Sequence, residues 1–205
     1  MSKRLITVFG PKLGGKTTVS RELCEQMPDS ETLECFKPET WLDPGWGQFL
    51  TALQRSPYDK EPQTRDKHVL QAYLAARVAL RDVNTVVMDE DPCMHWLTNF
   101  AAEYGTQDAT GSLHEALVAI TDETLKVSPG RIALHVTVAG QAPEVRAGIL
   151  AERAQIDYTS EQLADSAHRI AAADQVEQYL REANAPVFRI NTNEPYDIAA
   201  ITQGL

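Results

Sequence analysis

One short stretch near the start of the chain has the composition and spacing of a phosphate-binding loop. Residues 10–17 fit the pattern G-x-x-x-x-G-K-[ST], between an apolar run and a helical pattern. Glycines let backbone N–H groups surround an anion, and the helix N-terminus adds positive potential. In such a loop Lys16 brings its charge to the β- and γ-phosphates, and the hydroxyl of Thr17 binds Mg²⁺. We therefore expect ATP, or a close relative, and Mg²⁺ as cofactors of this phosphate loop.

The residues expected to bind the nucleotide extend one position beyond the motif. They are Gly10, Pro11, Lys12, Leu13, Gly14, Gly15, Lys16, Thr17 and Thr18. For Lys12 there are two interpretations, a contact with phosphate and a solvated surface lysine.

An acidic cluster follows the apolar run at residues 85–88. Enzymes with a phosphate loop place a carboxylate near Mg²⁺ at the end of such a strand, directly or through water. We expect Asp89 to take this metal-binding and catalytic role. The alternatives are Glu90 or Asp91 as the metal-side group or base, and an acidic turn without a chemical role.

The elements that must position these residues alternate between strands and helices. Strands are expected at 4–9, 32–36, 85–88, 131–138 and 187–190. Helices are expected at 16–26, within 40–58, at 64–81, 94–104, 113–126, 143–153 and 159–184, and from residue 195 onward. This alternation predicts an α/β fold with a parallel sheet covered on both faces and ligands at the carboxyl ends of the strands. We expect the three-layer P-loop NTPase fold, with a five-stranded parallel sheet and a short lid at about 153–160.

Length and composition limit the classes of protein that fit. The 205 residues suit a single domain, 1–205. A net charge of -10 disfavours a nucleic-acid partner. Without an apolar stretch long enough for a membrane span or signal, we expect no membrane partner and a cytoplasmic location.

Cysteines and histidines show no metal-binding pattern in the sequence. Cys24, Cys35 and Cys93 are scattered and are expected to be reduced, mostly buried thiols. The five histidines lack metal-ligand spacing, and His135 is expected to be a packed core residue of its strand.

Four segments resemble the deoxynucleoside kinase and thymidylate kinase families. The first is the phosphate loop. The others are Phe-Lys-Pro-Glu-Thr-Trp at 36–41, Leu-Gln-Ala-Tyr-Leu-Ala-Ala-Arg at 70–77, and the segment at 142–153 that opens Ala-Pro-Glu-Val. Together they span most of the chain. The resemblance implies transfer of a phosphoryl group from ATP to a small nucleoside or nucleotide acceptor, and related folds suggest a homodimer.

The resemblance also implies roles for individual residues. Gln71 would hydrogen-bond the edge of the base, since its amide is both donor and acceptor. Trp41 and Tyr73 would shape the pocket for base or sugar, and Arg77 would lie near the 5′ end of the substrate. Arg153 would close over the transferred phosphoryl group and offset its charge.

Departures from the family pattern leave the acceptor open. The families carry a catalytic glutamate just before the proline, where this chain has Lys37, and Glu39 follows the proline instead. A nucleoside 5′-hydroxyl needs a base, Glu39 or Glu34, whereas a deoxynucleoside monophosphate needs cations, for which Lys37, Arg77 and Lys12 are candidates. Lys37 slightly favours the monophosphate as the acceptor.

Further departures from the family pattern leave two other functions open. Glu90 stands where the families have an arginine, and the lid has one arginine, Arg153, where two are usual. Arg146 either compensates for the second or is a surface residue of its helix. The alternatives are a kinase of another hydroxyl, such as a modified base in DNA, an antibiotic or a metabolite, and a non-catalytic nucleotide-binding regulator.

Overall fold

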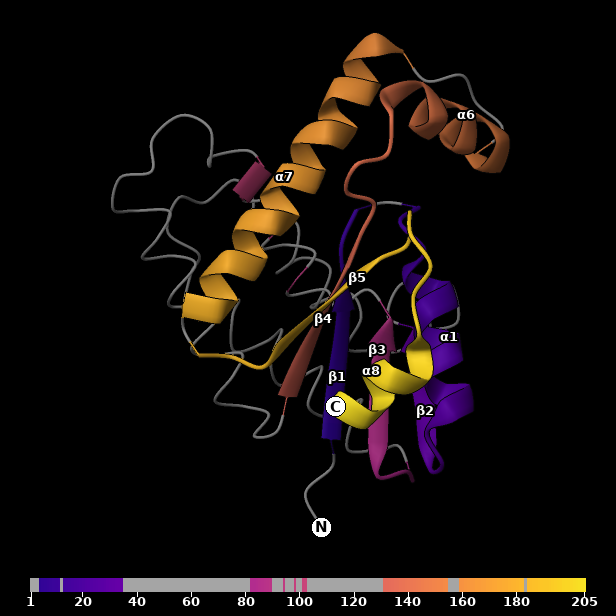
Figure 1. Ribbon diagram of the computed structural model, residues 1–205, viewed down its shortest axis with the longest axis vertical. Helices are drawn as coiled ribbons and strands as arrows, with labels where there is room; N and C mark the ends of the chain where they lie inside the picture. Colours follow the sequence, from indigo (N-terminus) through magenta and orange to yellow (C-terminus); the bar gives the residue numbers. More distant parts are fainter. Residues whose placement is uncertain are drawn as a thin grey trace, which may run out of the picture.

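The computed structural model describes residues 4–11, 13–34, 82–89, 94, 98, 101–102, 131–154, 159–182 and 184–205. Five parallel strands form one sheet in the order β2-β3-β1-β4-β5 (Figure 1). The strands are β1 (Arg4–Phe9), β2 (Ser30–Glu34), β3 (Thr85–Asp89), β4 (Arg131–Thr137) and β5 (Val187–Asn191). The helices with described bounds are α1 (Lys16–Gln26), α6 (Pro143–Ala154), α7 (Ser160–Glu182) and α8 (Ile198–Gly204).

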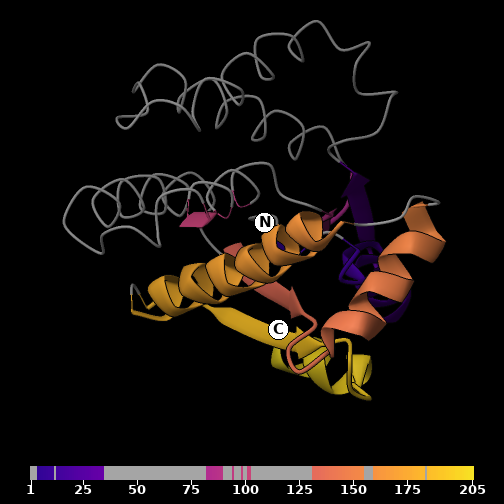
Figure 2. The same cartoon turned by 90° about the horizontal axis from the view of Figure 1, so that it is seen from above.

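Helices cover both faces of this sheet. Figure 2 shows α7 and α8 on opposite sides of the strands. Alternate residues of β1 and β4 enter two separate hydrophobic cores, as expected for strands buried on both faces. Phe9 and Ala133 pack in the core that includes Val176 and Leu180 of α7. The opposite core contains these residues of β1, β4 and α1: Ile6, Val8, Leu134, Val136, Val19 and Leu23.

The carboxyl ends of the strands meet at one edge, and this edge positions the candidate site. Figure 1 shows α6 beyond this edge, near the start of α1. Since all five strands are parallel, the last residue of β3 and the described residues that follow β1, β4 and β5 gather there although they lie far apart in the sequence. The predicted three-layer α/β fold with a five-stranded parallel sheet is confirmed.

Two of the boundaries that differ from the sequence prediction have a visible local reason. The second strand begins at Ser30, two residues before the expected start, because the Asp29 turn is fastened to the start of β3. The backbone N–H of Thr85 donates to the carbonyl oxygen of Asp29, and Asn84 hydrogen-bonds its carboxylate. The last helix begins at Ile198 rather than at residue 195, because the Asp197 side chain accepts from two backbone N–H groups of its first turn.

The helices predicted at 64–81 and 113–126, and the one within 40–58, lie outside the described residues. Of the helix predicted at 94–104, the four described residues, Met94, Thr98, Ala101 and Ala102, are helical. In the described segments, no helix has the length and apolar character needed to cross a membrane.

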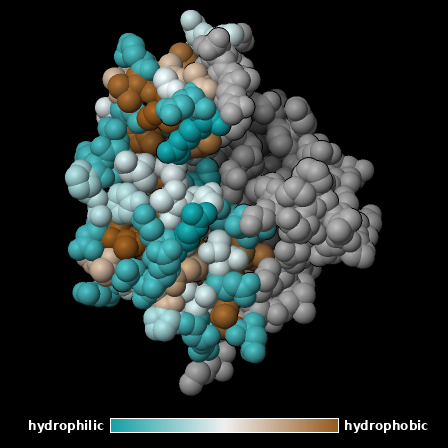
Figure 3. All heavy atoms as spheres, turned by 90° about the vertical axis from the view of Figure 1, so that its right-hand side faces the viewer, coloured by the Kyte–Doolittle hydropathy of each residue, from teal (hydrophilic) through white to brown (hydrophobic). Residues whose placement is uncertain are grey.

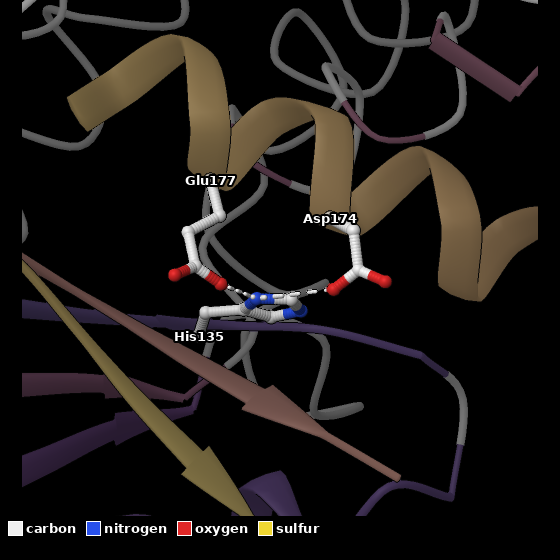
Figure 4. Close-up of side chains that lie close together, drawn as sticks. All are labelled: His135, Asp174 and Glu177. Carbon is white, nitrogen blue, oxygen red and sulfur yellow. Dashed lines mark hydrogen bonds and ion pairs between the residues drawn. The ribbon is translucent and has the colours of Figure 1, made fainter. Parts of the chain in front are cut away.

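A charged network ties α7 to strands β4 and β5, and Figure 4 shows the part of it between α7 and His135 of β4. Nδ1 of the fully buried His135 lies 2.5 Å from Oε2 of Glu177, and Arg189 of β5 reaches both Glu177 and Asp174 at 2.8 Å. Arg181 adds an ion pair to Glu177 at 2.7 Å. Burial on its own would raise the pKa of Glu177, but hydrogen bonds from His135 and Arg181 and the charges of His135 and Arg189 lower it to about 2.

His135 is therefore a packed strand residue, as expected. It also contacts Glu177, and its position in the sequence does not predict that contact. Its ring stacks on Phe9 with centroids 4.8 Å apart. Its carboxylate partner Glu177 is 42 positions away in the chain.

We expect Glu177→Gln to destabilise the protein by about 3 kcal/mol at pH 7, because it removes a buried charge that His135, Arg181 and Arg189 all contact. The folded pKa of Glu177, about 2, lies below the ordinary value of 4.5. The stabilisation by its charge is therefore complete above about pH 4.5 and is lost as the pH falls through about 2. Urea unfolding should show a smaller difference between wild type and variant at pH 3 than at pH 7.

Glu182→Gln is the matched control, since Glu182 is an exposed residue of the same helix that accepts a hydrogen bond from Gln178. An equal loss of stability in both variants, or a loss in Glu177→Gln that is unchanged at pH 3, would contradict the proposed stabilisation.

Candidate nucleotide-binding site

The phosphate loop connects the end of β1 to the first residue of α1, as its sequence predicts. Gly10 has φ +144°, and a Cβ atom built on it would lie 1.9 Å from the carbonyl oxygen of Val136 in β4. Gly15 has φ +95° and lies against Thr192, which follows β5. Glycine is therefore required at position 10 both by the backbone conformation and by the neighbouring strand.

Side chains from three elements hold the carbonyl oxygens of the loop. Nζ of Lys16 donates to the carbonyl oxygens of Gly10 and Pro11, at 3.2 and 2.8 Å. Oγ1 of Thr192 donates to the carbonyl oxygen of Gly14 at 2.7 Å. Nη1 of Arg146 in α6 donates to the carbonyl oxygen of Leu13 at 3.2 Å.

These contacts suit an anion site. The carbonyl oxygens of Leu13 and Gly14 are already bonded, to α6 and to the turn after β5. Backbone N–H groups and the positive end of α1 then remain as the groups that favour phosphate. Lys16 is 7% exposed, and its ammonium group bonds two carbonyl oxygens of the same loop, so its charge lies where phosphate is expected.

Of the two residues expected to bind the metal ion, Thr17 is the second residue of α1 and Asp89 is the last residue of β3. Asp89 is buried at the end of β3, with Oδ1 3.5 Å from Oγ of Ser20, one turn further along α1 than the exposed Thr17. Glu34 pairs with Asp89 in the register of β2 and β3. A hydroxyl and carboxylates are oxygen ligands of the kind that Mg²⁺ prefers. Binding of one metal ion by Thr17 and Asp89 stays a prediction.

The two arginines of α6 differ in their surroundings. Arg153, in the last turn, is exposed, and its expected role over the phosphoryl group is still a prediction. Arg146 is 5% exposed and contacts the phosphate loop, so the interpretation of Arg146 as a surface residue is wrong.

On the side of the molecule that carries α1 and α6 the surface is largely hydrophilic, with hydrophobic side chains gathered toward its upper end (Figure 3).

Sequence reasoning missed Ser20 and Thr192. The available signal for Thr192 was its position directly after the fifth strand, at the edge of the sheet where the loop lies. Several predicted site residues fall outside the described residues and stay predictions: Lys12, Lys37, Glu39, Trp41, Gln71, Tyr73, Arg77, Glu90 and Asp91. Residues 155–158 of the predicted lid also lie outside them.

A second group with metal-ligand chemistry lies within the charged network under α7. His135, Asp174 and Glu177 offer one ligand atom each, all within 4.8 Å of one another. The guanidinium of Arg189 already bridges the two carboxylates. Because this cation neutralises the oxygens that a metal would use, the group is an ion-pair network that stabilises the fold.

We expect Gly10→Ala to destabilise the protein by roughly 3 kcal/mol, since the added methyl group collides with the backbone of β4 and neither strand can move alone. Gly140→Ala is the matched control. Gly140 also has a positive φ, +78°, but nothing lies within 4 Å of a Cβ there, so only backbone strain of about 1–2 kcal/mol applies. Chemical unfolding of both variants measures the difference, and equal losses would contradict the close approach of Gly10 and Val136.

Sequence comparison finds no relatives: no family model and no curated protein matches the chain. Comparison of structures does find similar proteins. The YorR protein of Bacillus subtilis, solved in complex with phosphorylated GDP, matches with a TM-score of 0.55 and 16% identity, over 98% of this chain and 92% of YorR. Thymidylate kinase from Candida albicans matches with a TM-score of 0.56 and 13% identity, over 99% of this chain and 89% of the kinase.

At these identities the likeness is one of fold. It extends over nearly the whole of each chain, and it includes the parallel sheet and its flanking helices. The chain thus has the three-layer α/β fold of P-loop kinases.

Proposed function

We propose that this protein transfers a phosphoryl group from ATP to a small nucleoside or nucleotide. The observation that carries the proposal is the phosphate loop itself, placed between β1 and α1 and held by Lys16, Arg146 and Thr192. A glycine-rich loop at a helix N-terminus, with a lysine at its end, has the chemistry to bind the phosphates of a nucleotide.

ATP, when bound, would supply the phosphoryl group, and Mg²⁺ would neutralise its oxygens. Residues of this chain would do the rest. Lys16 would hold the donor phosphates, and the hydroxyl of Thr17 and the carboxylate of Asp89 would hold the metal ion. Arg153 would offset charge on the group in transfer. The main contribution of the protein would be positioning, because phosphoryl transfer needs aligned reactants more than covalent chemistry from side chains.

Three observations bear on the acceptor. One structural neighbour is a thymidylate kinase, and another was solved with phosphorylated GDP, which supports an acceptor of the nucleotide class. The lysine at position 37 favours a deoxynucleoside monophosphate over a free hydroxyl. Glu34 keeps the nucleoside as the second candidate, since it ends β2 directly beside Asp89 and could serve as a base at this edge.

The test is a coupled assay of ADP release with MgATP. Deoxynucleosides, ribonucleosides and their monophosphates are offered as separate panels. We expect turnover with one panel, with deoxynucleoside monophosphates the first candidates. Lys16→Met should lower kcat/KM at least about a hundredfold, because it removes the charge and keeps the aliphatic stem.

Arg21→Met is the control, since it removes an exposed cation from the same helix, and it should retain wild-type turnover. Turnover that survives in Lys16→Met would contradict the assignment of the site. Binding of MgATP without turnover in any panel would contradict the proposed reaction and favour another acceptor or a regulator.

A further inference from the structure

Arg146 is a buried cation that contacts the phosphate loop. It is the fourth residue of α6, is 5% exposed, and donates to the carbonyl oxygen of Leu13, 133 positions earlier in the chain. The segment between β4 and α6 is short, residues 138–142. Helix α6 therefore starts at the carboxyl edge of the sheet and contacts the loop through this side chain.

The carbonyl group that accepts this hydrogen bond belongs to a residue with an unusual backbone conformation. Leu13 has φ +56°, a left-handed conformation that is costly for a residue with a branched side chain. Neighbouring interactions must hold such a residue in place. A guanidinium that binds its carbonyl oxygen does so, and the bond is strengthened by the charge of the donor.

The burial of Arg146 is difficult to explain by packing alone. Burying a charged group costs free energy, and apolar residues of similar volume often stabilise a protein at least as well. An arginine that is buried at this position and bonded to the loop expected to bind phosphate therefore points to a role in that loop.

The two arginines of α6 also stand in a fixed relation. Arg146 and Arg153 are seven residues apart, which is close to two full turns of an α-helix. Their side chains therefore leave the helix on nearly the same side, about 10 Å apart along its axis. Fastening Arg146 to the loop sets the orientation of the helix that carries Arg153.

We propose that Arg146 is a positioning residue that couples the phosphate loop to helix α6. By holding the carbonyl oxygen of Leu13, it keeps the loop in the shape that accepts donor phosphates, and it orients α6 so that Arg153 faces them. This inference rests on the proposed function, because it assigns a role within the same donor site.

The experiment compares Arg146→Met and Arg146→Lys with wild type. The affinity for a fluorescent ATP analogue with Mg²⁺ is measured by titration, independently of turnover. We expect Arg146→Met to weaken binding roughly ten- to hundredfold, the factor for a lost hydrogen bond from a charged donor. Arg146→Lys should recover part of this loss. The urea midpoint of Arg146→Met should remain close to that of wild type, which separates positioning from a structural role.

Arg169→Met is the matched control, because Arg169 pairs with Asp165 on the surface of α7, and it should bind like wild type. Coupling to Arg153 is tested by a double-mutant cycle on kcat/KM with Arg153→Met. We expect the double variant to lose clearly less than the product of the two single losses, since Arg146→Met already misplaces Arg153.

The outcomes distinguish this inference from the proposed function. If wild type binds no MgATP, the proposed function fails first. If wild type binds it and Arg146→Met binds equally well, the positioning role is wrong. A lowered urea midpoint in Arg146→Met with unchanged nucleotide affinity would show a structural residue, and multiplicative losses in the cycle would overturn the coupling to Arg153.

Discussion

The close approach of two backbones, at Gly10 and Val136, is the constraint on which the candidate site depends. The end of β1 passes so near to β4 that no side chain fits at position 10. This contact fixes where the chain leaves the sheet, and the sheet itself is rigid because its strands are buried on both faces. The turn that follows can therefore hold residues in left-handed conformations, and α1 begins at a defined place and angle.

Around this fixed point the loop is held mostly by polar contacts. Its carbonyl oxygens accept bonds from α1, from α6 and from the turn after β5, so elements from the two ends of the chain complete one short segment. In α7 too, apolar and polar contacts have different roles. Apolar residues cover the sheet, while a charged network at His135, Glu177 and Arg189 sets how the helix lies across β4 and β5. Directional bonds thus specify positions that apolar packing alone would leave less defined.

The sequence predicts those features that local chemistry determines. Glycine, lysine and threonine at the spacing of residues 10–17 are typical of a phosphate-binding loop, so this segment predicts its own conformation. The apolar runs locate all five strands to within two residues. The carboxylate at the end of β3 follows from the strand that precedes it. The fold class then follows from the alternation of strands with helices.

Contacts between distant positions could not be predicted in this way. The burial of Arg146 depends on a carbonyl oxygen 133 positions away, and the partner of His135 is 42 positions away. Nothing in the neighbours of either residue indicates such a partner. The start of β2 was misplaced for a related reason, because its first pairing depends on the link between Asp29 and the residues that open β3. Such links become visible only once the strand order is known.

The bond between Thr192 and Gly14 has a consequence for the order of events in synthesis. It joins residues 178 positions apart, so the loop leaves the ribosome well before Thr192, the residue that holds it. A nascent chain carries residues 10–17 long before the strand and turn that shape them exist. Because contacts over such long separations form late and slowly, the ability to hold a nucleotide should appear in the last stage of folding rather than in the first.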